Sequence, residues 1–161
     1  RLALVRTAAC RLALDTVHAA AADARALPFR QQMFDRVLVD APCTGLGVLR
    51  RRAEARWRAR PSGAAALAAL QRDLLHAASL AVRPGGTVVY AVCTLTEEET
   101  LGVDEWAATT LPDLVAEPPP GAPWRPWGRG ALLLPHLAGT DGMFVLRLRD
   151  QPGERPVTLL P

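Results

Sequence analysis

Two cysteines stand just past apolar runs that read as buried strands. Cys43 comes shortly after the run Arg36–Asp40, and Cys93 comes shortly after the run Thr87–Ala91. In an open α/β sheet, ligands and reacting groups gather outside the carboxyl ends of the strands. A thiolate is a strong nucleophile. Two thiols delivered to that edge by separate strands therefore predict covalent chemistry on a ring that needs both a nucleophile and a base.

The residues that follow Cys93 favour a thiolate at this position. Thr96 stands three residues before Glu99, which is the spacing of a capping box and predicts a helix from there to about Leu111. The amino terminus of a helix carries a partial positive charge, and that charge stabilises a nearby thiolate.

Strands and helices alternate around the two cysteines. Between the motifs, Ser62 can cap a helix that runs to about Val82, and Pro84-Gly85-Gly86 ends it. A turn at Asp141-Gly142 precedes a final strand over Met143–Leu148. The alternation predicts a mostly parallel α/β sheet, with the last strand free to run antiparallel at or near the edge.

Three flanking segments have less regular patterns. Arg1–Leu14 predicts an amphipathic helix, and Thr16–Ala21 predicts a short, alanine-rich strand that ends at Asp23. Glu117–Gly130 is rich in Pro, Gly and Trp and predicts an ordered surface excursion. We expect the four tryptophans to anchor the core or the loops: Trp57, Trp106, Trp124 and Trp127.

Length and composition bound the class of protein. The 161 residues suffice for one domain, half of them are hydrophobic, and no apolar run approaches the roughly 20 residues of a membrane span. The three cysteines are an odd number and lie far apart, which argues against a disulfide framework, and no pair has zinc-ligand spacing. We expect a cytoplasmic protein without metal, in which Cys10 is a small buried hydrophobe.

The positive charge of the chain comes entirely from arginine. The formal net charge is +3, and all 19 basic residues are arginine. One cluster follows the first cysteine motif: Arg50, Arg51, Arg52, Arg56, Arg58 and Arg60. Its members can form a solvated helix face, or they can contact RNA phosphates, because the planar guanidinium binds two phosphate oxygens at once.

Four stretches together resemble the Sun-type (Fmu-like) RNA cytosine-C5 methyltransferases. They are DAPCTG at 40–45, PGGTVVYAVCT at 84–94, TEEE at 96–99 and LLLPHLAGTDGMF at 132–144. The resemblance extends over about residues 1–149. It implies an α/β, Rossmann-like doubly wound sheet, S-adenosylmethionine as cofactor, and RNA as partner, ribosomal RNA above all.

The resemblance also implies a role for each candidate residue. Cys93 would be the nucleophile that adds to C6 of cytosine, and Cys43 would act in the release step. Asp40 would lie at the cofactor and the target base, and Asp23 would approach the adenine of the cofactor. Arg50–Arg52 are our candidates for RNA contact on a separate ground, since they directly follow the first cysteine loop. His136 and Asp141 match the closing motif, and we interpret them as loop structure.

The glycine-rich loop of such enzymes is missing from this sequence. No glycine occurs before Gly45, although a cofactor loop after a first strand needs glycines for its tight turn. We therefore expect residues 1–150 to be the carboxyl-terminal portion of a catalytic domain that lacks its first strands, followed by a tail at 151–161. Alone, this portion is expected to bind little cofactor and to be inactive.

Two other readings of the sequence remain open. An amino-group methyltransferase of the same fold would carry Asp/Asn-Pro-Pro-aromatic at the first strand end, and Asp40-Ala41-Pro42-Cys43 does not fit that pattern. A non-catalytic RNA-binding remnant would keep the fold and the arginines without the cofactor loop.

Overall fold

The computed structural model describes residues 2–58 and 60–151. Within them, one sheet contains β1 (Phe34–Asp40), β2 (Val82–Val92), β3 (Leu114–Ala116), β4 (Arg125–Trp127), β5 (Gly130–Leu133) and β6 (Met143–Asp150). The helices are α1 (Leu2–Arg11), α2 (Ala55–Arg58), α3 (Pro61–Ala81), α4 (Leu101–Thr110) and α5 (Pro135–Ala138), with a 3-10 turn η1 at Leu46–Val48.

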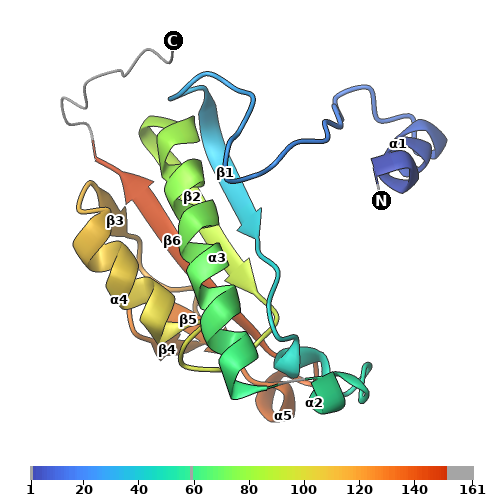
Figure 1. The fold of residues 1–161 in the computed structure, drawn as a ribbon, viewed down its shortest axis with the longest axis vertical. Helices are drawn as coiled ribbons and strands as arrows, with labels where there is room; N and C mark the ends of the chain where they lie inside the picture. The colour runs from blue at the N-terminus through green and yellow to red at the C-terminus, as the bar shows by residue number, and fades with distance from the viewer. Residues whose placement is uncertain (1, 59, 152–161) are drawn as a thin grey trace.

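The two loops that carry the cysteine motifs leave the sheet side by side. β1 and β2 are parallel neighbours, and their pairing ends with Val39 opposite Tyr90 and Asp40 opposite Ala91. The Ala41 N–H then donates to the Ala91 carbonyl at 3.2 Å. Because the last pairs are level, both chains exit at the same edge, toward the end of the molecule where α2 and α5 lie (Figure 1).

One face of the sheet is covered by α3 and α4 (Figure 1). Alternate residues of the two central strands point into this core: Val88, Tyr90 and Val92 from β2, and Phe144, Leu146 and Leu148 from β6. Helix α3 begins with Pro61 at its first position, where the missing N–H costs no hydrogen bond. A buried stripe recurs every three or four positions, as a helix face requires: Ala64, Ala68, Gln71, Leu75 and Ala78. Near the end of the helix, Ala77, Ser79 and Ala81 are buried as well.

The predicted α/β class is confirmed, but the predicted arrangement of the sheet is partly wrong. β6 runs antiparallel, as expected, yet it lies between β2 and β5 rather than at or near an edge. Among the described strands only β1 and β2 pair in parallel, so this part of the sheet is not mostly parallel. The physical reason is that the segment predicted as a surface excursion forms short strands, and the β4–β5 hairpin extends the sheet beyond β6.

That hairpin is ordered, as predicted, because polar contacts hold it to α4. The Asp104 side chain is buried, and its carboxylate accepts hydrogen bonds from the Nε and the backbone N–H of Arg129 at 2.7 and 2.8 Å. The Trp127 indole N–H donates to the Thr100 hydroxyl at 3.2 Å. A buried carboxylate needs such partners, since a charge left unpaired in the interior is costly.

The amino-terminal segment departs furthest from expectation. α1 is shorter than the predicted Arg1–Leu14 helix and buries no residue, so Cys10 is exposed rather than a buried hydrophobe. Figure 1 shows α1 set apart from the sheet at the end of a long connection. The strand predicted over Thr16–Ala21 does not form. Its alanines bring little side chain to bury, and no described strand pairs with the outer edge of β1.

Element boundaries elsewhere shift by a few residues. α3 starts at Pro61 with Arg60 as its cap rather than at Ser62, and α4 starts at Leu101 rather than at Thr96. The start of α4 is therefore further from Cys93 than the capping-box spacing predicted. The predicted tail lies, from residue 152 on, outside the described residues.

None of the described helices combines the length and apolar content needed to cross a membrane.

Candidate active site

The structure brings the two predicted cysteines into contact. Cys43 lies in the loop after β1 and Cys93 in the loop after β2, and their Sγ atoms are 3.3 Å apart. Both side chains are half-buried. The two sulfurs therefore share one small, partly shielded region, in which a proton can pass between them.

The surroundings of Cys43 favour its protonated form. Burial is the largest cause that raises the pKa of Cys43 from 9.0 to about 12, and the hydrogen bond and charge of Cys93 add to it. Backbone N–H groups of Gly45 and Cys93 donate to the Cys43 sulfur and partly oppose this shift. At neutral pH Cys43 is therefore a thiol, and its sulfur stays in hydrogen-bond contact with that of Cys93.

We expect alkylation of Cys43 by iodoacetamide to be slow and steeply dependent on pH. Between pH 8 and pH 10 the Cys43 thiolate fraction should rise about tenfold per pH unit, since both values lie below a pKa of about 12. Cys93→Ala should lower the pKa of Cys43, because two of its three raising causes come from Cys93, while burial, the largest cause, remains. Mass-spectrometric peptide mapping after short pulses measures the rate. A plateau near pH 9 in the parent protein would contradict the assignment of the proton to Cys43.

A third loop, residues 139–142 between α5 and β6, contacts the two cysteine loops through backbone hydrogen bonds. The Gly47 N–H donates to the Cys93 carbonyl at 3.0 Å, and the Gly142 N–H donates to the Gly47 carbonyl at 2.8 Å. A Cβ on Gly47 would collide with the carbonyl of Gly142 and come within 2.9 Å of the Cys93 carbonyl oxygen. Only glycine allows the three backbones to approach this closely.

The same loop pairs with the arginine cluster. Arg51 Nε donates to Asp141 Oδ2 at 2.7 Å, and this hydrogen bond is the main cause that holds the pKa of Asp141 below its ordinary value. Asp141 is therefore part of a loop, as predicted. Its pair with Arg51 also ties the segment after Cys43 to the turn before β6. Arg51 is engaged in this pair, while Arg50 and Arg52 are exposed and form no ion pair within the part of the chain that the structure describes.

Trp57 does not behave as the anchor we expected. It is 76% exposed on α2, and the Arg56 guanidinium lies 4.7 Å from the centre of its ring. α2 is a single short turn that contacts η1 and offers no apolar face in which an indole could be buried. The exposed ring lies within the arginine cluster.

A buried polar network behind the cysteines was missed by sequence reasoning. Glu99, Gln71 and Tyr90 are fully buried, and each is hydrogen-bonded to residues of the cysteine loops or to one another. The sequence places Glu99 in a capping box and in the TEEE stretch, neither of which predicts this network, and no such cap forms. One signal was available: Gln71 is a long polar residue among the apolar residues Ala64, Ala68, Leu75 and Ala78 at helical spacing in α3.

The two candidate aspartates are not in the cysteine pair's immediate surroundings. Asp40 ends β1 and is exposed, and it lines a cavity of about 280 Å³ together with Pro42, Val39 and Leu27. Asp23 lies in the connection before β1, where Arg25 donates to its carboxylate at 2.8 and 3.1 Å and lowers its pKa to about 2. Ala24, the next residue, lines the same cavity as Asp40.

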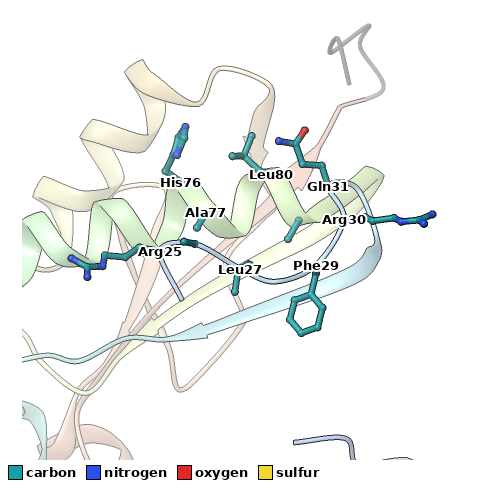
Figure 2. A pocket seen from close by; sticks show the side chains of 10 residues that line it. Arg25, Leu27, Phe29, Arg30, Gln31, His76, Ala77 and Leu80 are labelled. Carbon is teal, nitrogen blue, oxygen red and sulfur yellow. The ribbon is translucent and has the colours of Figure 1, made fainter. Parts of the chain in front are cut away.

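Another cavity, of about 350 Å³, lies away from the cysteines. Figure 2 shows its wall, formed by the carboxyl-terminal part of α3 and the segment before β1, with Arg25, Phe29, His76 and Leu80 among the lining side chains. Neither cysteine nor Asp40 lines it. Within residues 2–58 and 60–151, no group of three or more His, Cys, Asp or Glu side chains is placed to hold a metal ion.

The family model of the 16S rRNA methyltransferase RsmB/F matches residues 1–149. The chain belongs to this family. Among RsmB/F relatives, a putative methyltransferase of Mycobacterium tuberculosis is 51% identical over 120 residues, which cover 72% of this chain and 26% of that protein. The probable ribosomal RNA small subunit methyltransferase B of Bacillus subtilis is 38% identical over 162 residues, covering 94% of this chain and 36% of that protein.

Solved structures agree with the RsmB/F assignment. PH0851 matches with a TM-score of 0.87 and 30% identity over 92% of this chain and 34% of its own. NSun6 from Pyrococcus horikoshii with SFG matches with a TM-score of 0.79 and 31% identity over 95% of this chain and 39% of its own. These likenesses confirm the predicted Rossmann-like methyltransferase fold. The chain spans between about a quarter and two fifths of the length of these proteins.

Proposed function

We propose that this chain supplies the catalytic cysteines of an enzyme that methylates C5 of cytosine in ribosomal RNA, in the cytoplasm, with S-adenosylmethionine as methyl donor. The observation that carries the proposal is the 3.3 Å separation of the Cys43 and Cys93 sulfurs at the level ends of two parallel strands. Membership of the RsmB/F family supports a methyl transfer to RNA.

Cys93 is the nucleophile. C5 of cytosine is a weak nucleophile until a group adds to C6, so the reaction needs a covalent step. Cys93 gives its proton to solvent and its sulfur forms a bond to C6, while the electron pair of the C5=C6 double bond moves to C5, from which it can form a bond to a methyl group. S-adenosylmethionine, when bound, supplies that methyl group in electrophilic form.

Cys43 acts in the release step. After transfer, C5 carries a methyl group and a proton, and the proton has to leave before the C5=C6 double bond re-forms and the C6–sulfur bond breaks. Once Cys93 is bonded to the ring, it no longer offers the charge and hydrogen bond that help to raise the pKa of Cys43. Cys43 then gives its own proton to solvent more readily, and its thiolate accepts the proton from C5, so one proton passes in total from ring to solvent.

The residues present fit one wall of a cofactor site. The cavity beside β1 combines apolar side chains with the Asp40 carboxylate at its end, which suits a planar ring that bears an amino group. Asp40 and Asp23 are the residues that would hold the cofactor, while the glycine-rich turn is not in this sequence. NSun6, a structural neighbour, is bound to SFG, an analogue of S-adenosylmethionine.

The RNA would meet the surface that borders the third loop. Arg50 and Arg52 are exposed close in sequence to η1, which follows the Cys43 loop. They are the members of the cluster placed to contact phosphates, while Arg51 keeps its pair with Asp141.

The test uses the complete gene product and small-subunit ribosomal RNA labelled with tritium at C5 of cytosine. Methyl transfer at C5 expels the C5 hydrogen, so we expect one tritium released to water for each methyl group transferred. Methylation without tritium release would reject C5 as the target and favour an amino-group methyltransferase. Binding of RNA with no transfer at all would favour the non-catalytic remnant. RNA without label at C5 serves as the background control.

A further inference from the structure

We propose that Glu99 is a positioning residue that sets the separation of Cys43 and Cys93 through the threonines that follow them. The inference rests on the proposed function, because it concerns the geometry of the two sulfurs that the reaction would use. Glu99 touches neither sulfur in the structure. It contacts the loops that carry them.

Glu99 is a fully buried carboxylate with four hydrogen-bond donors. Its Oε1 accepts from the Thr44 N–H and from Gln71 Nε2, both at 2.9 Å. Its Oε2 accepts from the hydroxyls of Thr44 and Thr96 at 2.6 and 2.9 Å. A buried carboxylate with two donors on each oxygen is a rigid junction, since each displaced donor would leave a buried polar group unsatisfied.

A chain of hydroxyls connects this junction to both cysteine loops. Thr44 follows Cys43 in sequence, and Thr94 follows Cys93. The Thr44 and Thr94 hydroxyl oxygens are 2.7 Å apart. Because the single Thr44 hydroxyl proton goes to Glu99, Thr94 is the donor in this contact. The direction Thr94 to Thr44 to Glu99 is thereby fixed, and the residues directly after the two cysteines are held together.

The residue before Cys43 is tied to the same junction. Gln71 donates from Nε2 to the Pro42 carbonyl at 2.8 Å as well as to Glu99. The Tyr90 hydroxyl lies 2.8 Å from both the Gln71 side-chain oxygen and the Glu99 carbonyl, and its one proton is shared between them. Cys43 is thus held on both sides, by Pro42 and by Thr44.

These contacts are not those of an ordinary helix cap. The cap residue of α4 is Thr100, which makes no side-chain cap bond, and none of the four Glu99 donors belongs to the first turn of α4. The donors come instead from the loop after β1, from α3 and from the loop after β2. A buried charge facing those three elements fits a role in aligning the loops.

The test measures the separation of the sulfurs without relying on methylation. Diamide oxidises two neighbouring thiols to a disulfide and is itself reduced to the hydrazine, so the rate of Cys43–Cys93 cross-linking reports how often the sulfurs meet. The complete gene product carries Cys10→Ser, and mass spectrometry counts only the Cys43–Cys93 peptide pair. Steady-state kcat and KM for RNA are measured on the same preparations.

Two variants and their matched controls make the comparison. Glu99→Leu removes all four acceptor contacts, and exposed Glu98→Leu is its control. Thr94→Val keeps the shape and removes the one hydroxyl that links the loops, and Thr94→Ser restores it. We expect Glu99→Leu and Thr94→Val to slow cross-linking at least about tenfold and to lower kcat by about tenfold to a hundredfold. KM for RNA should stay within about twofold, since both side chains are fully buried.

Cross-linking of both variants within about twofold of the parent rate overturns the proposal, whatever happens to kcat. If Glu99→Leu does not fold, Thr94→Val against Thr94→Ser decides alone. A parent that cross-links fast but never methylates cytosine, together with slow variants, supports the positioning role and rejects the proposed function. A methylating parent whose variants cross-link at its rate rejects the positioning role only.

Discussion

Replacing Cys93 with alanine in the complete gene product is expected to abolish methyl transfer to RNA. The variant loses the atom that would bond to C6, and no other described sulfur can take its place, since Cys43 is held as a thiol and Cys10 is exposed on the remote α1. Removal of a covalent nucleophile lowers turnover by at least about a thousandfold. Transfer of tritiated methyl groups to small-subunit ribosomal RNA measures the loss.

Cys10→Ala is the matched control for that experiment. It removes the third cysteine of the chain, which makes no contact with the site, and should transfer methyl groups at the parent rate. Retention of more than about a tenth of the parent activity in Cys93→Ala would exclude Cys93 as the nucleophile. The fold of the variant is checked by its far-ultraviolet circular dichroism.

Replacing Cys43 with alanine is expected to trap the enzyme on its RNA. Addition of Cys93 to C6 and the methyl transfer do not need the Cys43 sulfur, whereas loss of the C5 proton does under the proposed assignment. Turnover should therefore fall by about a hundredfold or more, the usual contribution of a positioned acid–base group. A protein–RNA band that resists denaturation should accumulate on gels.

Two further variants decide what that band means. Cys43→Ala combined with Cys93→Ala should give no adduct, because the bond to C6 would come from Cys93. Cys43→Ser should release RNA no faster than Cys43→Ala, since an alcohol is a far weaker acid than a thiol and forms no anion at neutral pH. If Cys43→Ala turns over at the parent rate and leaves no protein–RNA band, Cys43 has no role in the release step.

The strongest parts of the fold were predictable from local patterns. β1 and the second half of β2 are branched, apolar runs, and α3 has a long face of small apolar residues after a proline, so their type and order follow from composition and spacing. The first half of β2 contains Pro84-Gly85-Gly86, whose pattern predicts only the end of the preceding helix. The contact of Cys43 with Cys93 follows in turn, because parallel neighbours that end level bring their loops together. The position of the two cysteines therefore follows from patterns within each strand and from the order of the strands in the chain.

The remaining features depend on contacts distant in sequence. β4 includes a proline and has only three residues, and it becomes a strand because it pairs with β5, which is itself paired with β6. Glu99 has the spacing of a capping residue, yet buried donors from three other elements recruit it. The reverse holds for Thr16–Ala21, whose apolar residues find no strand to pair with among the described residues.

The glycine contact between Gly47 and Gly142 has a consequence for biosynthesis. Gly142 and the strand after it follow both cysteines in sequence, so a growing polypeptide emerges with two free thiols before the turn that seats their loops has been made. Until β6 inserts beside β2, the Gly47 carbonyl lacks its donor and the Cys93 loop has one of its supports missing. The full set of backbone contacts around the two cysteine loops therefore forms only once β6 is paired with β2.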